Sequence, residues 1–328
     1  MKEAESASVH WSKHSEETAG YWQLRFLLRL FRVFPVVILR LIVFPIGFCY
    51  FVFSKRAKTE SRRFLQKAAP LAADPATAKK CRCPLGALRH VLSFALAMTE
   101  KIQSWGGKFP FKHIHFQDDD IADLIRNLED GKGAFLICSH LGNAELLRGL
   151  TTFDRTGVSR KVPVTAVMDI KVTANFNRML NELNPQSGMD IISAEQVGPE
   201  TAFLLGERLA AGGLVAIAGD RTSALGGKNI AIPFLGKDAP FPSGVFYMAS
   251  LMKAPVYFVF GLRRKELALL PEYDMHVHKS AISFECSRKE RLARSEDLAR
   301  AFAALLEGYC KKQPFQWYNF FDFWQEGA

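Results

Sequence analysis

The sequence lacks the glycine-rich signatures with which many enzymes hold a nucleotide or present a serine nucleophile. It contains no G-x-x-x-x-G-K-[ST] loop, no G-x-G-x-x-G turn ahead of a helix and no G-x-S-x-G elbow. The stretches Gly226-Gly227-Lys228 and Gly236-Lys237 resemble phosphate-binding loops only weakly. Nucleotide hydrolysis, dinucleotide chemistry and α/β-hydrolase chemistry therefore have no support in the sequence.

Cysteine is scarce and irregularly spaced, with six in 328 residues. Cys81 and Cys83 are too close together for a zinc knuckle, and no second pair completes them. Two further pairs have no carboxylate or thiol at a suitable spacing to complete a metal site, namely His113 with His115 and His276 with His278. We therefore expect reduced thiols in a protein that faces the cytosol, and no metal ion.

Acidic residues are in the minority, 33 against 43 lysines and arginines, which gives a formal net charge of +10. Such a charge favours an anionic partner: a phospholipid surface, an acidic carrier protein, a phosphate-bearing cofactor or a nucleic acid. The densest basic run, from Lys55 to Lys67, directly follows the most apolar segment of the chain. That arrangement is typical of a membrane anchor, so we expect no nucleic-acid partner.

The amino-terminal part divides into three segments: a flexible stretch at 1–20, a membrane-associated helix at 21–54 and a basic, helical connector at 55–117. Four arginines within 25–53 fall on one side of a helical wheel, where they can reach lipid phosphates while the apolar side chains enter the interface. The segment either lies in the interface or spans the membrane, and a buried helix with paired arginines is the alternative. It begins too late for a cleavable signal peptide and has no small-residue cleavage site. The arginines are Arg25, Arg29, Arg32 and Arg40.

Residues 118–328 alternate between short apolar runs and amphipathic helical patterns. This order predicts an α/β domain with a mostly parallel sheet flanked by helices. Strands are expected at 134–139, 162–168, 189–192, 214–218 and 256–261, with an edge strand at 272–278. Helices are expected from 118, at 144–150, near 175–183, at 199–211, near 245–252 and from an N-cap at Ser295.

The stretch 134–145, AFLICSHLGNAE, carries the candidate catalytic pair. A buried strand ends at His140, and Glu145 falls in the first turn of the next helix, with Asn143 as its N-cap. Across such a junction a carboxylate can hold one imidazole nitrogen and make the other a base for a hydroxyl proton. The strand-end position favours this reading over a structural histidine, because ligands of open α/β sheets bind there.

Other polar groups follow predicted strands at Asp169, Asp220 and Arg221. An arginine at such a place can stabilise the oxyanion of a tetrahedral intermediate or hold a donor phosphate. A salt bridge between Arg221 and Asp220 or another carboxylate is an equally good reading of the sequence.

His140-x4-Glu145 resembles the H-x4-D/E signature of the glycerolipid acyltransferase superfamily. The rest of the chain resembles its branch of lipid A late acyltransferases (lauroyl- and myristoyl-transferases), from the amino-terminal membrane helix through the Asp220-Arg221 pair to the segments Ile232–Gly236, Pro242–Gly244 and Ala254–Val256. The ending PFQWYNFFDFW at 314–324 resembles instead a sub-branch found beside aryl polyene genes.

The resemblance implies an O-acyltransferase of the inner membrane of a bacterium, with its catalytic domain facing the cytoplasm. The donor would be an acyl carrier protein (ACP) or coenzyme A thioester, and the acceptor a hydroxyl of a lipid A-like glycolipid or an aryl polyene lipid. His140 would be the base, Glu145 its orienting acid and Arg221 or backbone N–H groups the oxyanion donors, without an acyl-enzyme, a metal or a bound cofactor. The alternative is an inert lipid-binding scaffold on the same fold. Expected substrate contacts are Asn143, Arg148, Asp169, Asn175, Arg178, Asp220, Lys228, Gly236, Lys237, Ser243 and Gly244.

Overall fold

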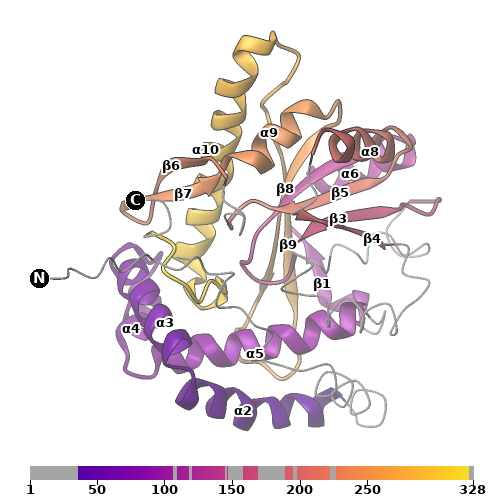
Figure 1. Ribbon diagram of the computed structural model, residues 1–328. Helices are drawn as coiled ribbons and strands as arrows, with labels where there is room; N and C mark the ends of the chain where they lie inside the picture. Colours follow the sequence, from indigo (N-terminus) through magenta and orange to yellow (C-terminus); the bar gives the residue numbers. More distant parts are fainter. Residues whose placement is uncertain are drawn as a thin grey trace, which may run out of the picture.

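The structure is a computed structural model. It describes residues 36–105, 109–117, 120–144, 146, 158–168, 189–194, 198–221 and 227–324. Within these ranges the chain forms a seven-stranded, mostly parallel sheet covered by helices, together with a separate two-stranded hairpin (Figure 1). The predicted α/β class with a mostly parallel sheet is confirmed.

The strands of the large sheet follow the order β1-β9-β8-β2-β5-β3-β4. From β8 to β4 every neighbouring pair is parallel, whereas β9 is antiparallel to β8 and parallel to β1. The stretch predicted as an edge strand is β9, but the edge beside it is formed by β1. The strands are β1 (Ile114–Phe116), β2 (Ala134–Cys138), β3 (Val164–Met168), β4 (Met189–Ser193), β5 (Leu214–Ala218), β8 (Val256–Arg263) and β9 (Tyr273–Lys279).

The hairpin of β6 (Asn229–Phe234) and β7 (Lys237–Pro242) was not predicted. Its two-residue turn has positive φ at both Leu235 (51°) and Gly236 (81°), which is the conformation of a type I′ turn. Three prolines made these strands hard to predict from the sequence, because proline lacks the N–H that a sheet requires and is tolerated only in edge strands and at strand ends. These prolines are Pro233, Pro240 and Pro242.

Buried side chains form a core on each face of the sheet. On one face, the hairpin and the C-terminal segment 313–324 pack with α8 (Pro199–Ala210), α9 (Ser243–Leu251) and α10 (Arg288–Lys312). On the other, α6 (Asp120–Glu129) buries Leu124 and Leu128 against the sheet. Strands buried on both faces consist of continuous apolar runs, which is why the sequence reveals them.

The last long helix begins earlier than predicted. Its N-cap is Ser287, which forms a reciprocal capping box with Glu290. Ser295 lies inside the helix, where its hydroxyl donates to the carbonyl of Leu292. The predicted N-cap at Ser295 was therefore wrong, because a serine can also satisfy its hydroxyl within a helix.

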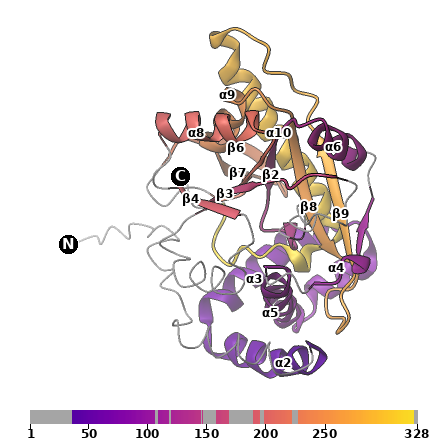
Figure 2. The same cartoon turned by 90° about the vertical axis from the view of Figure 1, so that its right-hand side faces the viewer.

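Residues ahead of the sheet form a layer of helices at the carboxyl ends of the parallel strands. Figures 1 and 2 show α2 as the outermost element, lying along α5. α3 contacts α2, α5 and the start of the carboxyl-terminal segment. The helices are α2 (Val36–Phe53), α3 (Lys55–Ala68), α4 (Pro75–Arg82) and α5 (Gly86–Trp105).

α2 is the described part of the expected membrane helix. Among the described residues no single helix is both long enough and apolar enough to cross a membrane. The segments Val37–Phe53 and Lys55–Leu71 meet the requirement of length and composition only together, as a pair bent by 91°.

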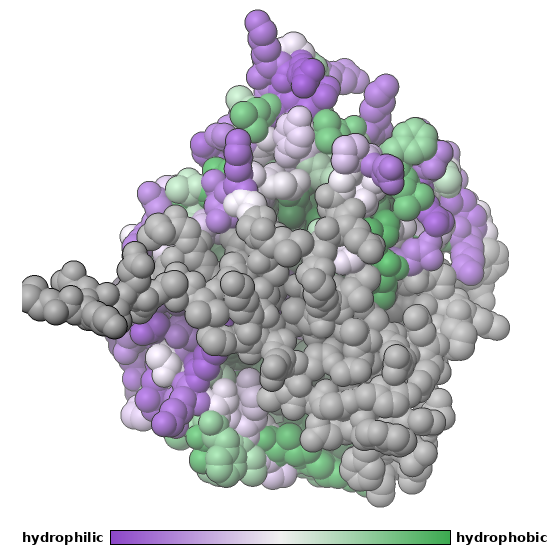
Figure 3. Space-filling view, in the orientation of Figure 1, coloured by the Kyte–Doolittle hydropathy of each residue, from purple (hydrophilic) through white to green (hydrophobic). Residues whose placement is uncertain are grey.

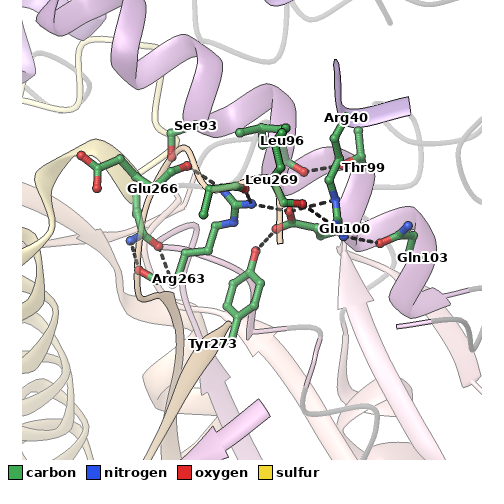
Figure 4. Close-up of polar contacts among 12 residues, drawn as sticks. Arg40, Ser93, Leu96, Thr99, Glu100, Gln103, Arg263, Glu266, Leu269 and Tyr273 are labelled. Atoms are coloured by element: carbon green, nitrogen blue, oxygen red, sulfur yellow. Dashed lines mark hydrogen bonds and ion pairs between the residues drawn. The ribbon is translucent and has the colours of Figure 1, made fainter. Parts of the chain in front are cut away.

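Arg40 on α2 turns into the protein, where its side chain is 4% exposed (Figure 4). It donates to the carbonyl of Leu269 (2.5 Å) and to Gln103 Oε1 (3.0 Å), and its Nε lies 3.8 Å from Glu100 Oε1. The expectation that Arg40 reaches lipid phosphates was wrong, and the alternative of a paired, buried arginine holds at this position.

Glu100 on α5 joins this helix to the sheet. Its carboxylate accepts from Arg263 of β8 (2.7 Å) and from the hydroxyl of Tyr273 of β9 (Figure 4). Arg263 also donates to the carbonyls of Glu266 and Ala268. One buried carboxylate thus bridges two buried guanidinium groups, and these contacts hold α2 and α5 against β8 and β9.

We predict that Glu100→Gln lowers the free energy of unfolding by about 3–5 kcal/mol, because it leaves Arg40 and Arg263 buried without a counter-charge. The measurement is urea unfolding followed by circular dichroism. The control is Arg300→Ala, which removes surface pairs with Glu296 and Asp297 and should change the free energy by about 1 kcal/mol or less. Equal losses in the two variants would contradict the prediction.

Candidate active site

Two neighbouring strands bring His140 and Asp220 together. β2 and β5 are parallel, with Cys138 opposite Ala218 at their carboxyl ends. Two residues after each strand come His140 and Asp220. The N–H of Gly219 donates to the carbonyl of Cys138 (2.9 Å), which extends the ladder between the strands. The two side chains therefore meet at the same edge of the sheet.

Asp220 holds His140 at two points. The Nδ1 of the imidazole lies 2.7 Å from Asp220 Oδ1, and the backbone N–H of His140 donates to Oδ2 (2.8 Å). A third donor, the indole N–H of Trp317, reaches the same Oδ2 at 2.9 Å. Because the carboxylate is the acceptor, Nδ1 carries the proton and Nε2 is the basic nitrogen.

The charge states of this pair suit a proton acceptor. Burial alone would raise the pKa of Asp220, but the charge of His140 and the hydrogen bonds from His140 and Trp317 lower it below its usual value. Burial, together with the positive charge of Arg221, lowers the pKa of His140 despite the opposing effect of Asp220. At neutral pH the aspartate is therefore ionised and the histidine is neutral, with 27% of its side chain exposed.

The backbone after His140 is clamped between β8 and the C-terminal segment. Gly142 N–H donates to the carbonyl of Gln316, and Asn143 N–H donates to that of Gly261, both at 2.7 Å. Gly142 has a φ of +68°, and a Cβ there would lie 1.9 Å from the oxygen of Gly261. Tyr318 N–H in turn donates to the carbonyl of His140 (3.0 Å). Only glycine fits this crossing, which fixes the position of the imidazole.

Arg221 lies beside the pair, close enough for its charge to lower the pKa of His140. Its Nε donates to Asn319 Oδ1 (3.1 Å), one of its terminal nitrogens donates to the carbonyl of Tyr318 (3.3 Å), and its guanidinium faces the ring of Phe321. These two hydrogen-bond acceptors are neutral groups.

Asn143 is fully buried three residues after His140. Neither its amide nitrogen nor its amide oxygen has a hydrogen-bond partner among the residues that the structure describes. A buried amide in this condition costs stability unless a ligand completes it. The contact of Asn143 with a substrate stays a prediction.

The remaining predicted site residues, which are Glu145 and the expected substrate contacts, divide into two groups. Five lie outside the described ranges and so stay predictions: Glu145, Arg148, Asp169, Asn175 and Arg178. Five others belong to the hairpin and the start of α9: Lys228, Gly236, Lys237, Ser243 and Gly244.

In this second group the described contacts are structural. Ser243 donates both its N–H and its hydroxyl to the carbonyl of Lys228, which closes the base of the hairpin. Gly236 supplies the positive φ of the turn, and Lys237 begins the second strand of the hairpin. Asp220, predicted to contact the substrate, is fully buried and bonded to His140 and Trp317, and its contact with a substrate stays a prediction.

The sequence analysis missed Trp317 and His90. His90 on α5 is buried, and its Nε2–H donates to the carbonyl of Trp317 (2.9 Å), so that its Nδ1 accepts from the hydroxyl of Ser61 on α3 (2.9 Å). In the sequence, His90 lies among the apolar residues of a helical pattern, and no neighbouring residue indicated a chemical role for it. The aromatic residues around Trp317 pack in the core, and its indole N–H also donates to Asp220.

A family model described as "Bacterial lipid A biosynthesis acyltransferase" matches residues 8–326. No curated protein matches the chain. The match covers nearly the whole sequence and agrees with the family resemblance noted above, without distinguishing the sub-branch associated with aryl polyene genes.

We predict that His90 weakens the fold in acid. Burial lowers the pKa of His90 from 6.5 to about 4, so between these values the unfolded chain binds a proton that the folded chain does not. Above pH 6.5 His90 is neutral in both states and costs the fold nothing. Below that pH the free energy of unfolding falls progressively, by about 3 kcal/mol near pH 4. Urea unfolding of wild type and His90→Gln over this range measures it. The difference in free energy of unfolding between wild type and His90→Gln should change with pH. A difference that stays constant over the range would exclude the effect.

Proposed function

Because the chain belongs to the bacterial lipid A biosynthesis acyltransferase family, we propose that it moves an acyl group from an acyl-ACP or acyl-CoA thioester to a hydroxyl of a lipid. The single observation that carries the chemistry is the contact between His140 Nδ1 and Asp220 Oδ1 at the end of two parallel strands. A histidine oriented by a buried carboxylate, with its second nitrogen directed away from that carboxylate, is the usual arrangement of a general base.

In the proposed reaction His140 Nε2 takes the proton of the acceptor hydroxyl. The alkoxide oxygen attacks the thioester carbonyl carbon, and the oxyanion of the tetrahedral intermediate is stabilised by the guanidinium of Arg221. When the intermediate collapses, the C–S bond breaks and the thiolate takes the proton back from the imidazolium. The acyl group thus reaches the acceptor in one displacement, and the protein residues return to their starting protonation states.

Asp220 takes the orienting role that the sequence analysis gave to Glu145. An imidazole has two nitrogens, and the base function requires that one of them stay available to the substrate. With Nδ1 occupied by Asp220, a carboxylate on Nε2 would block the reaction. We therefore propose that Glu145 acts on the substrate or on the backbone of its own loop, and not as the acid that orients His140.

The acceptor we propose is a lipid A-like glycolipid or an aryl polyene lipid. The ending at 314–324 favours the second of these, since it is the part of the sequence that resembles the aryl polyene sub-branch. Asn143 is the residue that we place against the acceptor or the acyl carbonyl, because its buried amide lacks a partner in the described structure.

We further propose that α2 and α3 dock the enzyme on the cytoplasmic face of the inner membrane. Figure 3 shows an apolar surface where α2 lies in Figure 1. α3 follows at once and exposes Lys55, Arg56, Arg62 and Arg63, so that apolar and cationic side chains adjoin each other. Such a surface suits an anionic bilayer, with the apolar residues in the interface and the cations at the phosphates. The exposed apolar residues of α2 include Val37, Ile38, Leu41, Ile42, Ile46, Phe48, Val52 and Phe53.

The chemistry is tested by acyl transfer from acyl-ACP and acyl-CoA to lipid extracts, followed by mass spectrometry. We expect His140→Ala and Asp220→Asn to lower kcat by about 10²–10⁴-fold, since each disables the oriented base. The matched control is Asp238→Asn on the exposed hairpin, which should keep the wild-type rate. Equal and near-zero rates in wild type and all variants would favour the alternative of an inert lipid-binding scaffold.

The membrane surface is tested by sedimentation with vesicles that contain anionic phospholipid. We expect the double substitution Leu41→Asp and Ile46→Asp to weaken binding at least tenfold, because two charges enter the apolar face. Leu292→Asp on α10 is the control, since Leu292 is as exposed as Ile46 at 55% but lies on another helix. If the control weakens binding as strongly, or if the double variant binds like wild type, α2 is not the docking surface.

A further inference from the structure

We propose that Trp317 is a positioning residue of the active site, whose indole N–H orients the carboxylate of Asp220 toward His140. This inference rests on the proposed acyl transfer, because its effect is read from the rate of that reaction. The proposal gives a role in the reaction to the indole of Trp317, whereas the neighbouring aromatic residues of the C-terminal segment pack in the core.

The two oxygens of Asp220 have different partners. Oδ2 accepts from two donors that cannot move independently of the fold: the backbone N–H of His140 and the indole N–H of Trp317. Oδ1 is left for the imidazole. Two donors on one oxygen fix the rotation of the carboxylate about its Cβ–Cγ bond, and this rotation determines where Oδ1 lies. The indole therefore acts on the base through Asp220.

Trp317 is itself held from several sides. Its ring is 1% exposed and packs against aromatic rings of three elements, those of Phe64, Phe234 and Phe323. Its carbonyl accepts from His90, whose other nitrogen is bonded to Ser61. This chain of contacts runs from α3 through α5 to the catalytic carboxylate. Because the site is buried, no solvent donor can readily replace the indole if it is removed.

Loss of the indole N–H has a chemical consequence beyond packing. The carboxylate would keep its charge with one fewer donor, so that it stabilises protonated His140 more strongly. Among the described residues, the other charged or titratable groups that interact electrostatically with the pair are Arg221 and Lys101, which act on His140, and Cys310 on α10, which interacts with Asp220. None of these is altered by a change at Trp317. The low-pH limb of activity should therefore move upward.

Trp324 provides a matched control within the same aromatic cluster. Its ring centroid lies 6.1 Å from that of Trp317 and its side chain is 8% exposed. Its indole N–H also donates a buried hydrogen bond, to the carbonyl of Phe234 at 3.1 Å. The two tryptophans thus share environment and bonding, but only Trp317 reaches the catalytic carboxylate.

The test compares Trp317→Phe with Trp324→Phe in the full chain, through kcat, KM and the pH dependence of acyl transfer. For Trp317→Phe we expect kcat to fall at least tenfold, KM to change less than twofold, and the acid limb to move up by about half a pH unit. For Trp324→Phe we expect wild-type kinetics, whatever its loss of thermal stability. If Trp317→Phe does not fold, 3-benzothienylalanine incorporated at position 317 keeps the shape of the indole without its N–H, and the same changes are expected.

Two outcomes overturn the inference, and they differ from each other. If the wild type transfers acyl groups and the variants at 317 keep the kcat and acid limb of Trp324→Phe, Trp317 only packs and the proposed function stands. If the wild type transfers acyl groups from neither thioester, the proposed function fails and the role of Trp317 in it fails too.

Discussion

The structure depends on one buried carboxylate. Asp220 has no exposed surface, and an ionised group in that position is tolerated only when its oxygens are bonded to donors. The donors come from the loop after β2 and from Trp317, which lie 80 and 97 positions away in the sequence. The parallel pairing of β2 with β5 and the course of the C-terminal segment must therefore both be correct before Asp220 can be ionised. The site and the fold share the same long-range contacts.

The glycines near the site follow from this constraint. The chain after β2 must pass close to β8, and a side chain at Gly142 would collide with the oxygen of Gly261. Gly219 precedes Asp220, and a Cβ there would lie 2.8 Å from Ile137 and 3.0 Å from Phe302. Close packing, against backbone at Gly142 and against side chains at Gly219, leaves His140 and Asp220 little freedom to move apart. Preorganisation of this kind lets a base act without first reordering its surroundings.

The sequence revealed the strands but not their neighbours. Runs such as 134–138 and 214–218 are apolar because both faces are buried, so their existence and ends could be predicted. That β2 pairs with β5 was not evident, because sheet order depends on tertiary packing. In the sequence, His140 was therefore paired with the nearby acid Glu145, and its contact with Asp220 at 2.7 Å was not predicted. Trp317 and His90 gave no signal, since a tryptophan in an aromatic run and a histidine in an apolar helix are ordinary core residues.

The same limit explains Arg40. A cationic residue on an apolar helix indicates a lipid interface unless a buried carboxylate balances it, and Glu100 lies on another helix. The pairing has a consequence for α2. Because Arg40 points inward to Glu100 and Arg263, the opposite face, with Leu41 and Ile46, must point outward. The ion pair thus sets the rotation of α2 about its axis, and with it the direction in which its apolar face is presented. That rotation is coupled through Arg263 to β8, the strand against which the loop of His140 is clamped.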